Sequence, residues 1–288
     1  MTRHPPFEEV EASRPDFEAS YSPVATKVPK PNFVPGSGLN TLPYAEDFSP
    51  ERATWRCIKP EEQALGDMYK LMISAVTPRP IAFISTRSAE GEENLAPMSY
   101  FNMVSHDPPT IVVSVQGGSK KHADGFKDTN HNVKETKEFC VSIISEPFLE
   151  AANYTSIDAP NDISEWKLSG LTQRPSETVK PAHVAESAFS MECSLMHWYE
   201  ITGSSGKTSN TVMLGRVNRI HAKEFVFDPE DPMKVLVEKL RPVARLGGIT
   251  YSRTNQTMEV PRPVWDQVKD SPEVKAALEA PVKRVERE

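Results

Sequence analysis

Three stretches of the chain combine hydroxyl, amide and cationic side chains, the groups that bind a phosphate and the hydroxyls of a polyol. The polar candidates are Ser85, Thr86, Asn94, Ser99, Lys127, Asp128 and Thr129. The middle stretch also contains Ala96, Pro97 and Met98, a small and rigid backbone against which a flat apolar ring could lie. Taken singly, each residue has a plain structural explanation, because Ser-Thr at a strand end is usually a turn device. Together they could supply the contacts that one such ligand needs.

A longer pattern contains these residues. Residues 77–115 read TPRPIAFISTRSAEGEENLAPMSYFNMVSHDPPTIVVSV. This string resembles the opening of the flavin reductase-like domain family, in which a PRP-strand-ST segment precedes NLAP-x-SYFN and DPP. The resemblance continues with KDTNHN at 127–132, EFCVSII at 138–144 and RPVARLGG-x-x-Y at 241–251. It spans residues 68–251, and the combination is more specific than any one short motif.

The resemblance implies a cofactor and the residues around it. FMN, with FAD as the alternative, needs donors for its phosphate, a slot for its ring and hydrogen bonds along the ring edge. By the resemblance, the stretches named above line the flavin, and Arg245 and Tyr251 approach from the closing motif. His106, in VSHDPP, could face the substrate side of the flavin or could be bonded to backbone at a strand end. No other catalytic residue is assigned.

Three functions remain open at this point. The leading one is a reductase that passes hydride from NADH or NADPH to FMN, in some cases as the partner of an oxygenase or another electron acceptor. The second is a flavoenzyme with its own organic substrate, whose pocket residues 158–184 would cover. The third is a non-enzymatic flavin-binding protein. Proteins of this kind hold the flavin at a two-fold interface, so the resemblance also implies a homodimer with the N-terminal arm as a strap between subunits.

Composition excludes several other classes of protein. The 288 residues carry a net charge of −7 with no block of lysine and arginine, which disfavours a nucleic-acid partner. No apolar run approaches the ~20 residues of a membrane helix or forms a signal-peptide core, so we expect a cytoplasmic protein. The three cysteines lack CxxC spacing, which argues against a structural metal or disulfide framework.

Two further motifs have bland interpretations. Residues 203–208, GSSGKT, end like a phosphate-binding P-loop, but Ile201 stands where that motif needs glycine and a strand follows, so we predict a hairpin tip. His122 and His131 lie nine residues apart with no evident third ligand, and we predict no metal site there.

The elements that must position these residues are mostly strands. Apolar, β-branched runs predict strands at 80–87, after Asn94, at 110–116 and at 138–144, and a long hairpin from 188 to 227. Residues 120–137 predict a surface helix, and residues 272–279 lie in a predicted helical fragment. We therefore predict a mainly β fold with helical excursions, an antiparallel Greek-key split β-barrel of the FMN-binding type, over residues 61–255. An extended arm at 1–60 and a charged tail at 256–288 flank it.

Overall fold

The computed structural model describes residues 6–50, 54–119, 122, 124–160 and 163–284. Its contacts divide the chain into two units. The larger is Cys57–Thr254, and in the smaller Met1–Arg56 joins Asn255–Glu288. The larger unit contains all the motifs that resemble the family pattern. Among the described residues, no helix has the length and apolar character needed to cross a membrane.

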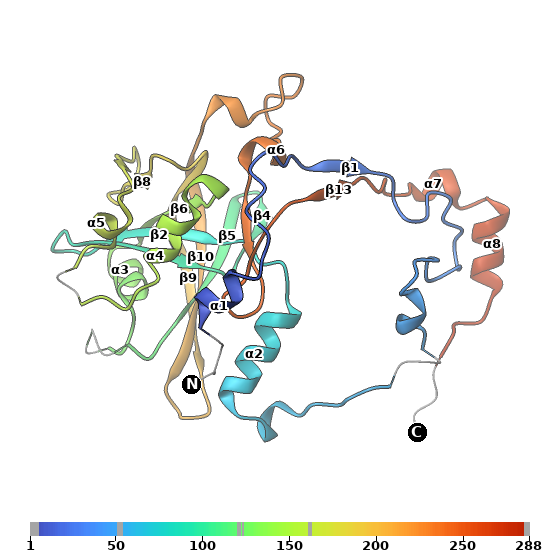
Figure 1. Cartoon of the computed structure of the whole chain (residues 1–288), viewed down its shortest axis with the longest axis horizontal. Coiled ribbons are helices and arrows are strands. Elements are labelled where there is room, and N and C mark those ends of the chain that lie inside the picture. The colour runs from blue at the N-terminus through green and yellow to red at the C-terminus, as the bar shows by residue number, and fades with distance from the viewer. Residues whose placement is uncertain (1–5, 51–53, 120–121, 123, 161–162, 285–288) are drawn as a thin grey trace. The chain divides into compact units, whose positions relative to one another are not determined.

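One antiparallel sheet of seven strands forms most of the larger unit (Figure 1). Its strands are β2 (Ala82–Arg87), β3 (Glu93–Met98), β4 (Phe101–His106), β5 (Pro109–Gln116), β6 (Glu138–Ile143), β9 (Phe189–Thr202) and β10 (Thr208–Ala222). Their order in the sheet is β3-β2-β6-β9-β10-β5-β4. The short pairs β7 (Gln173–Arg174) with β8 (His183–Val184) and β11 (Val243–Arg245) with β12 (Tyr251–Arg253) lie outside it. The predicted strands and the long β9–β10 hairpin, with residues 203–207 in its turn, are confirmed.

The strand order requires the sheet to curl. β3 and β4 lie at opposite ends of that order, yet only Ser99 and Tyr100 separate them in the chain. A link this short cannot cross the five strands between them, which are spaced about 4.8 Å apart. The backbone amide of Ser114, in β5, donates to the carbonyl of Tyr100 at 2.8 Å. The two edges of the sheet therefore approach each other, as a barrel requires.

β2 is buried on both faces, which explains its unbroken apolar run. Ala82 and Ile84 belong to a core inside the curled sheet, together with Phe139 of β6. Phe83 points the other way, into a second core that includes Trp166. A strand between two cores has no solvent face, so its sequence cannot alternate between apolar and polar residues.

Gly215 of β10 lies where the inner core is tightest. A Cβ atom there would be 2.4 Å from the Cζ atom of Phe139, which is 1% exposed. We expect Gly215→Ala to lower the free energy of unfolding by about 1–3 kcal/mol, because the buried ring must move. Urea denaturation followed by circular dichroism would measure this. Gly66→Ala is the control, since a Cβ at Gly66 meets nothing within 4 Å; equal stability of the two variants would contradict the prediction.

Short helices connect and cover the strands. They are α2 (Leu65–Ala75), α3 (Asp128–Thr136), α4 (Leu149–Tyr154), α5 (Glu165–Ser169) and α6 (Val237–Leu240), with 3₁₀ turns η2 (Pro60–Glu62), η3 (Glu146–Phe148) and η4 (Glu224–Val226). The helix predicted over residues 120–137 is shorter than expected and begins only at Asp128, with residues 120, 121 and 123 outside the described part. It ends where Lys137 adopts a left-handed conformation, with φ 64°.

Residues 158–184, the segment expected to cover a substrate pocket under the second function, are tied to the outer face of the sheet, and we call this segment the excursion. The Ser85 hydroxyl donates to the carbonyl of Ala182, and the Ser142 hydroxyl accepts from the backbone amide of Val184. The Cys140 thiol lies 3.2 Å from the carbonyl oxygen of Pro181. These polar side chains alternate with core residues along their strands, so they face outward and bind the excursion's backbone.

In the smaller unit, the two ends of the chain pair with each other. β1 (Val24–Thr26) runs parallel to β13 (Gln256–Met258). The helical elements are α1 (Phe7–Glu11), η1 (Ala45–Phe48), α7 (Trp265–Val268) and α8 (Pro272–Glu279). α8 confirms the predicted helical fragment, and Ser271 caps it by accepting from the amide of Val274 at 3.3 Å. Many aromatic side chains of this unit remain exposed, Trp55 at 90%.

Candidate functional site

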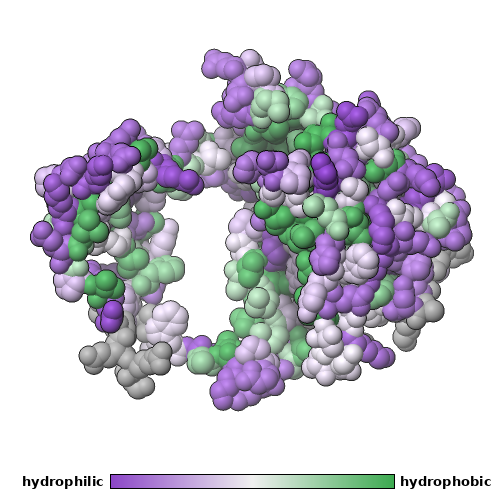
Figure 2. All heavy atoms as spheres, turned by 180° about the vertical axis from the view of Figure 1, so that it is seen from behind, coloured by the Kyte–Doolittle hydropathy of each residue, from purple (hydrophilic) through white to green (hydrophobic). Residues whose placement is uncertain are grey.

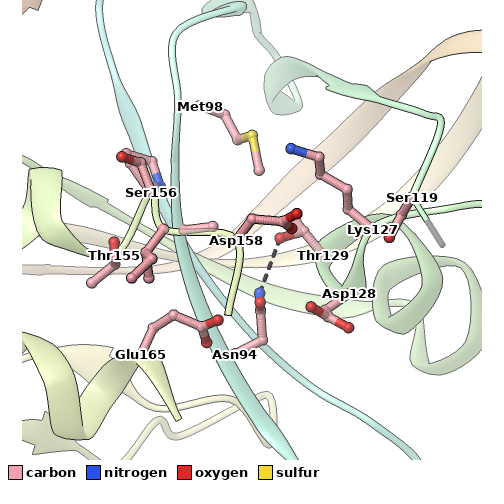
Figure 3. A pocket seen from close by; sticks show the side chains of 13 residues that line it. Asn94, Met98, Ser119, Lys127, Asp128, Thr129, Thr155, Ser156, Asp158 and Glu165 are labelled. Atoms are coloured by element: carbon pink, nitrogen blue, oxygen red, sulfur yellow. Dashed lines mark hydrogen bonds between the residues drawn. The ribbon is translucent and has the colours of Figure 1, made fainter. Parts of the chain in front are cut away.

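A hollow of about 130 Å³ opens where β3 passes the start of α3 (Figure 3). Most of the predicted binding residues line it. From the prediction it contains Asn94, Ala96, Pro97, Met98, Lys127, Asp128 and Thr129. The fold therefore brings together two stretches that are separated in the sequence by β4, β5 and the loop after them.

A second hollow, of about 230 Å³, adjoins the first and shares Pro97, Met98 and Lys127 with it. It adds Ser99, the remaining predicted residue of the middle stretch, and Tyr100. We call the two hollows together the β3 groove, because both follow β3 and its link to β4. Burial, together with the neighbouring Tyr69 hydroxyl, raises the pKa of Tyr100, so its hydroxyl keeps its proton and can donate to a ligand.

Buried polar side chains hold the floor of the β3 groove in place. The Asn94 amide donates to the Thr129 hydroxyl at 3.0 Å and to the Thr86 hydroxyl at 3.2 Å. Asn132 donates to the same Thr86 hydroxyl at 3.0 Å. Thr86 is 1% exposed and Thr129 2%. This network links β2, β3 and α3, so Thr86 supports the groove from beneath and does not line either hollow.

Lys127 is the one cationic side chain among the described residues that line the β3 groove. It precedes the first residue of α3, so its ammonium and the first amides of the helix lie at the same end. Within the described part of the chain, this ammonium has no hydrogen-bond or ion-pair partner. A helix N-terminus beside a free cation favours an anion such as a phosphate.

Ser85 does not line the β3 groove. It is 2% exposed, and its hydroxyl donates to the carbonyl of Ala182 in the excursion. The Ser85 hydroxyl, which we predicted to contact the flavin, connects residues 158–184 to the sheet in the structure.

Arg245 and Tyr251 also lie apart from the lining of the β3 groove. The Arg245 guanidinium stacks 4.5 Å from the centre of the Tyr251 ring, and the Tyr251 hydroxyl donates to the Asn153 side chain at 2.7 Å. Arg79, from the PRP segment, connects them to the groove. Its backbone pairs with that of Arg245, and its buried guanidinium lies 3.4 Å from the Ser99 hydroxyl. The sequence reasoning overlooked Arg79 although it lay within the quoted motif.

Two histidine features of the sequence also lie outside the lining. His106 is exposed at the end of β4. His122 and His131 stack with ring centres 4.1 Å apart, and each binds a carboxylate, Asp128 for His122 and Asp124 for His131. Burial opposes ionisation of Asp124, but its bonds to His131 and to the backbone amide of Phe126, with the charges of the two histidines, together lower its pKa. No metal-binding group of three or more ligands occurs among the described residues.

The first hollow also has a wall that the sequence motifs did not identify. It comes from the loop before α3, the end of α4 and the excursion, and consists of Ser119, Thr155, Ser156, Ile157, Asp158 and Glu165. The proposed role of the excursion as a cover was the only signal that pointed there. Asp158 and Glu165 add carboxylates to this hollow, so Lys127 is the one side chain of its described lining whose charge favours an anion.

Comparison with known proteins agrees with the geometry. Residues 74–235 match the family described as the flavin reductase like domain. Nitrilotriacetate monooxygenase component B from Bacillus cereus is 35% identical, with a TM-score of 0.65 over 72% of this chain and 100% of that one. The 2-nitrobenzoate 2-nitroreductase of Pseudomonas fluorescens is 28% identical, with a TM-score of 0.62 over 73% and 98%.

A third comparison concerns the fold alone. A Shewanella frigidimarina structure described as a flavin reductase with a split barrel domain is 16% identical, with a TM-score of 0.60 over 75% of this chain and 98% of that one. The predicted fold class, a mainly β split barrel with helical excursions, is confirmed.

Proposed function

The chain belongs to the flavin reductase-like domain family, and on that premise we propose that it binds FMN in the β3 groove and accepts hydride from NADH or NADPH. The family and the fold support a flavin-related oxidoreductase. The observation that carries the finer proposal is the Lys127 ammonium at the start of α3, which has no partner among the described residues and lines the same hollow as Ala96–Met98.

The residues of the β3 groove fit the three parts of FMN. Lys127, the first amides of α3 and the Ser99 hydroxyl suit the phosphate. Hydroxyl groups of the first hollow, among them Thr155 and Ser156, suit the ribityl chain. The segment Ala96–Met98 presents a narrow, half-buried surface to the ring. FAD remains the alternative, since its flavin half has the same chemistry. Arg245, Tyr251 and Ser85 would act on such a ligand only through other residues.

The bound flavin would supply the redox chemistry, which the amino acids cannot provide. The chain's contribution is to bind and orient. The Asn94–Thr129–Thr86 network fixes β3 against α3, so the ring surface and the phosphate site keep a constant separation. Arg79 holds Ser99 and the end of α2 by donating to the carbonyls of Ile73 and Val76, both at 2.6 Å.

The purified protein tests this proposal directly. We expect FMN to bind, with visible absorbance of a bound flavin, and NADH or NADPH to bleach that absorbance under anaerobic conditions. Flavin binding without bleaching by either nicotinamide would exclude the reductase and leave a flavin carrier or a different electron donor. Failure to bind either FMN or FAD would overturn the whole proposal.

One observation favours a second function, reduction of an organic substrate by the flavoprotein itself. The excursion contributes Asp158 and Glu165 to the first hollow, so the groove has a wall beyond what a free flavin needs. The structurally similar Pseudomonas protein bears the name of a nitroreductase. Turnover of nitroaromatic acids with NADH or NADPH, faster than turnover of free FMN, would favour this function over the reductase.

We further propose a homodimer and, for the reductase function, an oxygenase or other electron acceptor as partner. The larger unit exposes apolar side chains on β4 and on β9, among them Met103 at 64% and Tyr199 at 67%. Hydrophobic residues are visible at the surface in Figure 2. Exposed apolar groups in such numbers are typical of an interface between subunits. The smaller unit, with its exposed aromatics, would serve as the strap between them.

A further inference from the structure

A separate hollow, of about 370 Å³, lies between the β7–β8 pair and the end of β10. None of its residues lines the β3 groove. Four of them carry ionisable groups, namely Arg174, His183, His221 and Lys223. The proposed function leaves this cluster unexplained.

Glu192 lies behind His221 and is fully buried. Its carboxylate accepts from the backbone amides of Glu177 at 2.7 Å and Thr178 at 2.6 Å, from the Thr178 hydroxyl and from the His221 Nε2 at 2.6 Å. Burial alone would raise the pKa of Glu192, but these four donors lower it to about 2. An ionised carboxylate can only accept, so the His221 Nε2 must carry a proton.

The other nitrogen of His221 is available to a ligand. Among the described residues, its Nδ1 has no protein partner, and His221 lines the hollow. If a proton binds to Nδ1, the imidazolium lies between the Glu192 carboxylate and whatever occupies the hollow. With one proton on Nε2, His221 donates to an anion only when Nδ1 carries a proton too, and Glu192 orients the ring for that bond.

His183 stacks on His221, with ring centres 4.5 Å apart and an angle of 12°. It is 4% exposed, and neither of its ring nitrogens has a hydrogen-bond partner in the described part of the chain. Burial, His221 and Arg174 lower the pKa of His183 to about 4, so the ring is neutral at physiological pH. The neutral His183 ring therefore stacks on His221 and would not repel a protonated His221 ring.

The hollow is lined by two cations and, among the described residues, by no carboxylate. Arg174 and Lys223 line it, and the nearby carboxylates are engaged elsewhere. Glu177 pairs with Arg219 at 3.3 Å, and Glu186 accepts from the backbone amide of Thr172 at 3.0 Å. The Lys223 ammonium uses one bond, to the carbonyl of Glu186 at 3.2 Å. Within the described residues, its other donors and the Arg174 guanidinium have no partner, so they can bind an anion.

We propose that this hollow is a second binding site, specific for a small dianionic oxyanion, in which Arg174 and Lys223 supply charge and His221, oriented by Glu192, donates a hydrogen bond. Sulfate and inorganic phosphate represent the ligand class. The hollow is larger than one such ion, and it is its two cations and imidazole that favour an oxyanion there. The inference does not depend on flavin binding.

The imidazole carbon–hydrogen signals of the full-length protein test the site. Sulfate, which stays dianionic over the working pH range, is added up to tens of millimolar at constant ionic strength, with chloride as the balancing anion. We expect saturable shifts of the His221 and His183 signals, assigned with His221→Gln and His183→Asn. Arg174→Gln and Lys223→Gln should each weaken sulfate binding at least roughly tenfold, the loss typical of one charge-assisted hydrogen bond.

Arg219→Gln is the matched control, because Arg219 is a nearby exposed cation that does not line the hollow. Its sulfate affinity should equal that of the natural chain. Absence of saturable shifts in the natural chain would overturn the proposal, as would shifts that persist unchanged in Arg174→Gln and Lys223→Gln. An equal loss in Arg219→Gln would also overturn it, since it would show a general effect of charge. Circular dichroism of each variant verifies that it folds.

Discussion

Replacing Lys127 by glutamine will weaken FMN binding by roughly tenfold to a hundredfold. The variant removes the one cation among the described residues of the β3 groove but keeps a side chain of similar length. A hydrogen bond from an ammonium to a phosphate is charge-assisted, and the helix dipole and amides of α3 remain to hold the phosphate in part. Flavin fluorescence or visible absorbance, titrated against the protein, measures the dissociation constant directly.

Lys134→Gln is the matched control for this prediction. It removes the same charge from the same helix, but the Lys134 ammonium pairs with Glu200 and does not line the groove. FMN affinity should change by less than about twofold. Lys127→Arg should recover part of the lost affinity, since it restores the charge in a different shape. Equal affinities of Lys127→Gln and the natural chain would rule out the proposed phosphate position.

Replacing Glu192 by glutamine will lower the free energy of unfolding by about 3 kcal/mol at neutral pH. The glutamine side chain has one acceptor oxygen for the four donors that bind the Glu192 carboxylate. Its NH₂ group would also point at some of those donors and could not accept from them. The excursion should lose its tightest attachment to the sheet, since Glu177 and Thr178 both bind this carboxylate through their amides. Urea denaturation measures the loss, and the control is Glu186→Gln, at a half-buried carboxylate just after the excursion that accepts from one backbone amide, that of Thr172.

The pH dependence of stability gives the same prediction a second readout. The pKa of Glu192 is about 2 in the folded protein against an ordinary value of 4.5, so its contribution is complete above pH 4.5 and disappears as the pH falls towards 2. The Glu192→Gln variant should lack this loss.

His183 should change the unfolding free energy in a higher pH range. Its folded pKa of about 4 lies below the ordinary 6.5, so stability falls as the pH drops from 6.5 towards 4. His183→Leu should remove that earlier loss only. A natural chain whose unfolding free energy is constant from pH 6.5 to 3 would contradict both assignments.

Much of the fold was predictable because strands and hairpins leave local patterns. The β-branched run at 110–116 and the two apolar stretches around residues 203–207 were sufficient to place β5 and the β9–β10 hairpin. The smaller unit was not predictable in the same way. β1 pairs with β13, and strands of three residues that are separated by most of the chain have no periodicity to detect.

Part of the candidate site was likewise predictable from continuous motifs, and part was not. Asn94 to Ser99 and Lys127 to Thr129 lie in two continuous motifs, so their order in the sequence was enough to predict that they share a site. Thr155, Ser156 and Glu165 complete the wall of the β3 groove only because the end of α4 and the excursion fold back beside β3. Ser85 shows the converse, since its position in the motif predicted a ligand contact but its hydroxyl binds the carbonyl of Ala182.

The sequence by itself therefore determined the strand-rich fold, the family and the two motifs that meet at the β3 groove, because these depend on residues that are close together in the chain. Only the tertiary structure decided which polar groups reach the groove and which tie down the excursion. It also decided that Arg174, His183, His221 and Lys223 surround one hollow. The physical reason is that side chains on the two faces of a strand have opposite surroundings, and what covers each face comes from distant parts of the chain.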